Sequence, residues 1–137
     1  MDTTSVLLVD DNLTFQGIVT RFLAAQDDVL VIGAVRGGEE ALTQVRELKP
    51  DIVLVDITLP NLSGGLRFIP RLRAVLPDVG IIALTLLGTD GCRRAALEAG
   101  VDEFVPKVNM GADLLAAIRR VRRVRQVQEG VAAVATN

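Results

Sequence analysis

The stretch IVLVDITLP at residues 52–60 decides the fold, because an apolar run ends there in Asp56 and is followed by Pro60. Residues 52–55 are all apolar and mostly β-branched, which indicates a strand covered on both faces. The stretch SVLLVDDN at 5–12 has the same pattern, with Asp10 and Asp11 after its apolar run. The two stretches together predict two buried strands with acidic carboxyl ends.

Further apolar runs lie between these two stretches and after them, and each run is followed by a stretch that suits a helix. Lys49-Pro50 and Leu76-Pro77 end two of the helices, because the residue before a proline disfavours the α conformation. Strands are predicted at residues 5–9, 29–34, 52–55, 80–84 and 103–105, and helices at 13–25, 38–48, 64–76, 90–99 and 111–126. Strict alternation with right-handed crossovers predicts an α/β fold. We expect a single five-stranded parallel sheet in the flavodoxin-like order 2-1-3-4-5, with helices on both faces.

Length and composition narrow the class of protein. The chain has 137 residues, half of them hydrophobic, a formal charge of −2 and no histidine. The length and the hydrophobic content predict one compact domain over residues 1–126, and we expect the tail over 127–137 to fray. The absence of histidine excludes His-based acid/base catalysis and zinc–histidine sites. The single cysteine, Cys92, excludes an internal disulfide. Neither a signal peptide nor an apolar run long enough to span a membrane is evident, so we expect a soluble cytoplasmic domain.

The chemistry of the chain is expected at the carboxyl ends of the strands, where ligands of such a sheet bind. Asp10 and Asp11 follow the first strand, Asp56 the third, Thr85 the fourth and Lys107 the fifth. One aspartate after a strand is commonly only a helix cap or a turn former. Three clustered carboxylates, however, repel one another unless a cation is present, and sparse oxygen ligands suit Mg²⁺. Together with a lysine and a hydroxyl, the set indicates phosphoryl transfer to a carboxylate.

The motifs VLLVDDN, DIVLVDITLPNLSGG, IIALT and AALEAGVDEFVPK resemble the receiver domain of two-component response regulators. The resemblance extends from about residue 5 to residue 125, nearly the whole chain, and is strongest toward receivers attached to helix-turn-helix transcription regulators. It implies that Asp56 accepts a phosphoryl group from a phosphohistidine. It also implies a Mg²⁺ site formed by Asp10, Asp11, Asp56 and the backbone carbonyl of Thr58.

The resemblance assigns a switch to the neighbouring strand ends. It implies that Lys107 pairs with the phosphoryl oxygens and that the Thr85 hydroxyl hydrogen-bonds to one of them. Phe104 stands at the aromatic switch position, where the ring turns inward as Thr85 moves, although ordinary core packing also suits a phenylalanine there. Leu86 replaces the small residue usual in the family, so we expect it to restrict access to the site.

Two catalytic alternatives fail on particular residues. A phosphatase of the haloacid dehalogenase type needs a second Asp two residues after the nucleophile, where this chain has Thr58. An FMN-binding flavodoxin needs a phosphate loop after the first strand, where Asp10 and Asp11 would repel the phosphate. We therefore expect no enzyme, but a phosphoacceptor domain that catalyses only its own phosphorylation and dephosphorylation.

The expected partner is a sensor histidine kinase or a phosphotransfer protein. A homodimer through the helix at 90–99, the strand at 103–105 and the helix at 111–126 is a further expectation, with neither specific nucleic-acid binding nor membrane binding. Five arginines within residues 119–125 suit a solvated face, salt bridges between copies, or a lead toward an effector domain. Two alternatives stay open: a receiver fragment of a DNA-binding transcriptional regulator whose output domain is missing here, and an atypical receiver regulated by partner binding alone.

Overall fold

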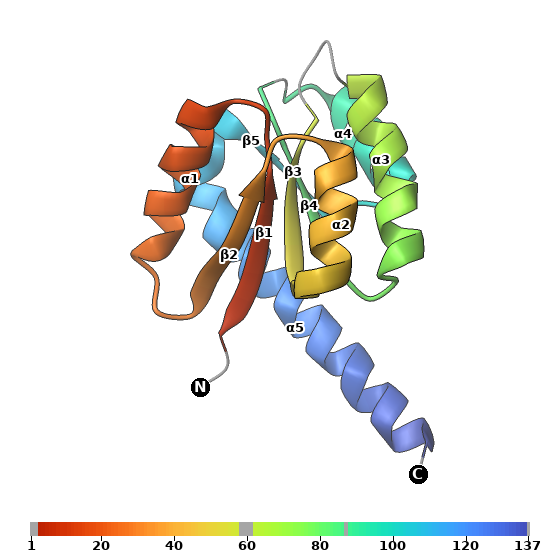
Figure 1. Ribbon diagram of the computed structural model, residues 1–137. Helices are drawn as coiled ribbons and strands as arrows, with labels where there is room; N and C mark the ends of the chain where they lie inside the picture. The colour runs from red at the N-terminus through yellow and green to blue at the C-terminus, as the bar shows by residue number, and fades with distance from the viewer. Residues whose placement is uncertain (1–2, 58–61, 87, 137) are drawn as a thin grey trace.

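The computed structural model describes residues 3–57, 62–86 and 88–136. Five parallel strands form one sheet in the order β2-β1-β3-β4-β5, and helices lie on both of its faces (Figure 1). The elements are β1 (Thr4–Val9), α1 (Leu13–Ala24), β2 (Val29–Val35), α2 (Gly38–Leu48), β3 (Ile52–Asp56), α3 (Leu62–Val75), β4 (Gly80–Thr85), α4 (Asp90–Ala99), β5 (Glu103–Pro106), the 3-10 turn η1 (Lys107–Asn109) and α5 (Met110–Thr136). The predicted fold and strand order are confirmed.

β1, β3 and β4 are buried on both faces, because their alternate residues enter two separate cores. In β1, Leu7 and Val9 pack into the core under α2, α3 and α4, whereas Val6 and Leu8 pack into the core under α1 and α5. This explains why the strand sequences are apolar throughout and show no alternation with polar residues. Gly100 follows α4 with a left-handed φ of 115°, a conformation that glycine adopts without strain.

The last helix is longer than the sequence analysis expects. The sequence predicts that it ends at residue 126, but α5 continues to Thr136 and extends past the body of the domain (Figure 1). Fraying of residues 127–137 stays a prediction. The added segment, VQEGVAAVAT, contains no proline and is rich in alanine. The three alanines favour a helix, whereas the three valines, Thr136 and Gly130 favour it less, so propensity alone does not determine where the helix ends.

Candidate functional site

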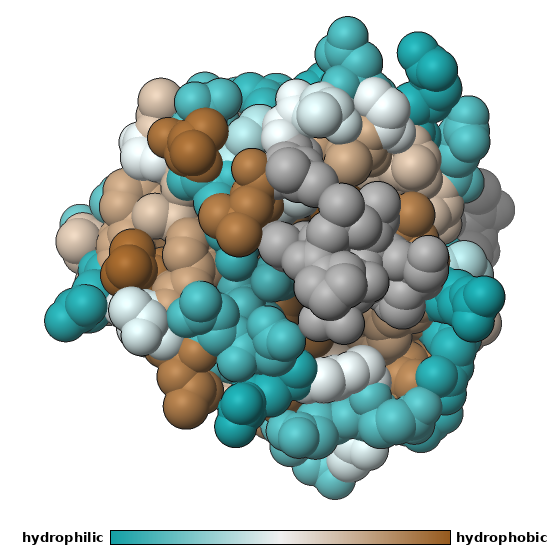
Figure 2. Space-filling view, turned by 90° about the horizontal axis from the view of Figure 1, so that it is seen from above, coloured by the Kyte–Doolittle hydropathy of each residue, from teal (hydrophilic) through white to brown (hydrophobic). Residues whose placement is uncertain are grey.

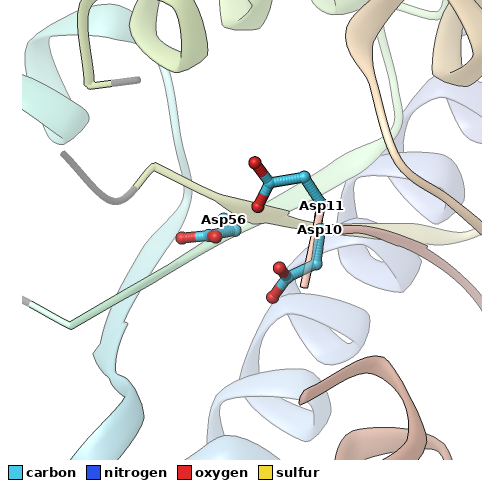
Figure 3. A group of neighbouring side chains, drawn as sticks. All are labelled: Asp10, Asp11 and Asp56. Carbon is cyan, nitrogen blue, oxygen red and sulfur yellow. The ribbon is translucent and has the colours of Figure 1, made fainter. Parts of the chain in front are cut away.

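Three carboxylates meet at the carboxyl edge of the sheet. β1 and β3 are neighbours and pair Val9 with Val55, so the residues that follow them, Asp10 and Asp56, lie side by side. One carboxylate oxygen each from Asp10, Asp11 and Asp56 lies within 4.8 Å of the other two. Figure 3 shows the three carboxylates extending into a common space from the two strand ends. The predicted cluster is therefore assembled by the sheet itself.

Lys107 supplies the positive charge of this cluster. It begins η1 just after β5, and its Nζ lies 3.0 Å from Oδ2 of Asp10 and 3.3 Å from Oδ2 of Asp56. Only 6% of the Lys107 side chain is exposed. Three carboxylates and one ammonium carry a formal charge of −2 (three times −1, plus 1). This remainder, presented by hard oxygen ligands, fits a divalent cation such as Mg²⁺.

The first turn of α1 fixes the loop that carries the acidic pair. The Asn12 side chain caps the helix by accepting a hydrogen bond from the Phe15 N–H at 3.0 Å, and the Asn12 N–H donates to Oδ1 of Asp10 at 2.8 Å. Nε2 of Gln16 donates to the backbone carbonyls of Asp10, at 2.6 Å, and Val35, at 3.0 Å. Gln16 thus ties the end of β1 to the end of β2, a role that sequence reasoning missed because no spacing rule marks it.

Phe15 is a second residue that the sequence analysis missed. The Nζ of Lys107 lies over its ring, 3.9 Å from the ring centroid. This distance is well inside the range of about 6 Å at which an ammonium is attracted to the face of an aromatic ring. A half-buried phenylalanine on the first turn of a helix indicates core packing, so the sequence offers no signal for this contact.

Burial sets the electrostatics of Asp10. Its side chain has no exposed surface, and this desolvation raises the pKa of the carboxyl above its ordinary value of 3.8. The nearby Asp56 carboxylate also raises the pKa, whereas the Asn12 N–H and the Lys107 ammonium lower it without reversing the effect. The ionised form of Asp10 is therefore disfavoured by folding, and a bound cation would offset this penalty.

The remaining predicted residues occupy the neighbouring strand ends. Thr85 ends β4 and is fully buried, and Phe104 of β5 is buried in the core under α4, in register with Ala83 of β4. Leu86, by contrast, is 60% exposed just after β4. Figure 2 looks down on this end of the sheet and shows several hydrophobic side chains standing among hydrophilic ones. The Thr58 carbonyl, predicted as a metal ligand, lies outside the described residues.

Most of the arginines of α5 form ion pairs within the chain. Arg119 pairs with Asp28 at 3.0 Å and Arg120 with Glu103 at 3.0 Å. Four of the five arginines lie within 4.0 Å of an acidic residue, the other two pairs being Arg122 with Asp51 and Arg125 with Asp102. Much of the charge that the sequence assigned to solvent or to a partner is therefore used to hold α5 against the domain.

Comparisons with known proteins agree with this arrangement. A sequence model of the response regulator receiver domain matches residues 6–119. The response regulator protein VraR of Staphylococcus aureus is 32% identical over 127 residues, which cover 93% of this chain and 60% of VraR. The chain thus spans about three fifths of the length of the curated relatives it matches.

Solved structures give the same result. The response regulator domain of Thermotoga maritima CheB has a TM-score of 0.76 and 28% identity, and the match covers 87% of this chain and 96% of the other. A LuxR-family two-component response regulator from Aurantimonas sp. has a TM-score of 0.83 and 26% identity, with 99% and 100% covered. Among the described residues, no helix is both long and apolar enough to cross a membrane.

Proposed function

We propose that this chain, which belongs to the receiver domain family of two-component response regulators, is a phosphorylation-dependent switch whose Asp56 accepts the phosphoryl group. The proposed donor is a phosphohistidine on a sensor histidine kinase or a phosphotransfer protein. One observation supports this proposal above all. Asp56 lies close to two further carboxylates and to a nearly buried lysine at the carboxyl ends of the strands.

The chemistry follows from the charges in the site. A carboxylate oxygen of Asp56 attacks the phosphorus, the P–N bond of the phosphohistidine breaks, and the imidazole leaves with the bonding electron pair. Negative charge builds up on the phosphoryl oxygens, and the Lys107 ammonium lies close enough to Asp56 to offset part of it. Mg²⁺ held by Asp10, Asp11 and Asp56 would supply the remaining positive charge when bound.

The proposed output uses the buried residues next to the site. The phosphoryl group adds nearly two negative charges beside the end of β4, where Thr85 lies. We expect its hydroxyl to donate a hydrogen bond to a phosphoryl oxygen, and Phe104, on the neighbouring strand, to repack in response. The changed face would be that of α4, β5 and α5, which is also the proposed homodimer surface.

The chain is proposed to act either alone or as the receiver part of a longer DNA-binding regulator. The second reading is supported by the curated relatives, of which this chain spans 60%. The cytoplasmic location and the lack of specific nucleic-acid binding by this chain stay predictions.

Incubation with acetyl phosphate and Mg²⁺, followed by intact mass spectrometry, tests the proposal. We expect one added phosphoryl group, which is lost when EDTA is present and absent from Asp56→Asn. The same assay on Asp78→Asn, an exposed aspartate before β4, controls for the change of charge. A kinase assay would follow a negative result: failure with both donors would contradict phosphorylation and favour a receiver regulated by partner binding alone.

A further inference from the structure

We propose that Phe15 is a positioning residue that holds the Lys107 ammonium in place through the face of its ring. The role of Lys107 in phosphoryl transfer rests on the proposed function, but the contact itself does not. The Nζ lies 3.9 Å from the ring centroid, and the lysine side chain is only 6% exposed. The ring is half-buried at the start of α1 and packs against the core formed with α5, so its own position is fixed.

The ring differs in kind from the other two contacts of the ammonium. Asp10 and Asp56 are both members of the carboxylate cluster, and a divalent cation there would compete with Lys107 for their oxygens. The ring of Phe15 has no ligand atom for a cation of this kind. Phe15 therefore stays in contact with the ammonium when the carboxylates bind a cation, and this contact keeps the lysine close to Asp56.

The competing explanation is that Phe15 only fills space in the core. An aromatic side chain of another kind and an aliphatic one separate the two explanations. Tryptophan has the strongest attraction for cations among the aromatic residues, whereas leucine is apolar but has no π-face. Phe22 offers a matched control, because it also lies on α1 and packs against the same core.

Lysine acetylation measures the hold on the ammonium directly. The chain has two lysines, Lys107 and the exposed Lys49, so Lys49 serves as an internal standard. The metal-free protein is treated with an N-hydroxysuccinimide ester of acetate, and the rates at the two lysines are compared by peptide mass spectrometry. We expect Phe15→Leu to raise the rate at Lys107 relative to Lys49 by between about twofold and about thirtyfold. Phe15→Trp should stay within about twofold of the wild type.

Phe22→Leu should leave the ratio unchanged, although it removes a ring from the same core. An unchanged ratio in Phe15→Leu would overturn the proposal. An equal rise in Phe15→Leu and Phe15→Trp would also overturn it, because the ring would then act only by its shape. A rise in Phe22→Leu as large as that in Phe15→Leu would show that loss of stability, and not loss of the contact, exposes the lysine.

The second readout links the contact to phosphoryl transfer. With acetyl phosphate and Mg²⁺, Phe15→Leu should take up the phosphoryl group more slowly than the wild type, and Phe15→Trp should restore the rate. A wild type that takes up no phosphoryl group would contradict the proposed function, while the acetylation ratios would still decide the role of Phe15. Normal uptake by Phe15→Leu together with a raised acetylation ratio would show that the contact does not serve the reaction, which overturns the assigned role.

Discussion

Replacing Asp10 by asparagine should stabilise the metal-free domain at neutral pH, even though it removes an ion pair. The Asp10 side chain is completely buried, and its net pKa shift is upward with burial as the largest cause. An acid whose pKa is raised by folding is more easily protonated in the native state than in the unfolded chain. Its ionised form therefore lowers the free energy of unfolding.

The size of the effect follows from the distances. With an effective dielectric constant of about 20, the Lys107 contact at 3.0 Å is worth about 5.5 kcal/mol. Repulsion from Asp56, with oxygens no more than 4.8 Å away, is at least about 3.5 kcal/mol. Removing the attraction and the repulsion together costs at most about 2 kcal/mol, whereas the penalty for burying the charge, which is removed as well, is several kcal/mol. Asp10→Asn should therefore raise the free energy of unfolding by about 1–2 kcal/mol.

The difference in stability between the wild type and Asp10→Asn should depend on pH. Below the ordinary pKa of 3.8, Asp10 is protonated in both states, so wild type and variant should be equally stable with respect to this group. As the pH rises through the raised native pKa, the wild type should lose stability relative to the variant. Mg²⁺ should reverse the order, because at one hundred times its dissociation constant it adds about 2.7 kcal/mol to a protein that binds it only when folded.

Urea unfolding followed by far-UV circular dichroism measures these differences, since the chain has no tryptophan or tyrosine for fluorescence. The series runs from pH 3 to pH 7.5 in EDTA, and it is repeated in Mg²⁺ at neutral pH. Asp78→Asn, a surface variant at the opposite edge of the sheet, controls for net charge. A wild type that is more stable than Asp10→Asn at pH 7 without metal would refute the reasoning, because the ion pair would then outweigh burial.

Two further predictions test other parts of the structure. The Asp102 carboxylate accepts a hydrogen bond from the buried Ile81 N–H at 2.8 Å and pairs with Arg73 and Arg125. Asp102→Ala should therefore lower the free energy of unfolding, measured with urea, by about 2–3 kcal/mol, and Asp102→Asn by about 1 kcal/mol. Equal losses in the two variants would mean that the charge, and not the Ile81 hydrogen bond, matters. Leu86→Ala should speed phosphoryl uptake from acetyl phosphate, because this leucine lies beside the site and is 60% exposed. The free energy of unfolding should change by no more than about 0.5 kcal/mol. Unchanged uptake kinetics would contradict a role of Leu86 in access.

The sequence predicts those parts of the site that the backbone topology determines. Once the strand order is known, the residues after β1 and β3 must be neighbours, and Lys107 follows a strand two places further along the sheet. The meeting of Asp10, Asp56 and Lys107 is thus a consequence of register, and it is confirmed. The lysine lies closer to Asp10 than to Asp56. This difference depends on side-chain conformations, which the pattern of apolar residues does not predict.

The same limit explains the arginines of α5. A run of basic residues on a helix indicates a solvated face or an interface, because the sequence does not show which acids the fold brings near. Asp28 lies 91 positions from Arg119, and Glu103 lies 17 from Arg120, so the pairs form only after the helix has docked. Solvent and salt screen exposed pairs of this kind, so each contributes little to stability, although together they help fix how the helix lies on the domain.

The charge balance of the resting site implies an order of events. Without a cation the cluster has a formal charge of −2, and a phosphoryl donor is itself negatively charged, so the two repel each other. A divalent cation would bring the charge of the cluster to zero, and only then would the attraction of Lys107 for the phosphoryl oxygens of the proposed donor be unopposed. Lys107 alone does not offset this repulsion, because its ammonium already pairs with Asp10 and Asp56. If Asp56 accepts a phosphoryl group as we propose, the residues that disfavour the ionised form of Asp10 also make this uptake depend on the metal.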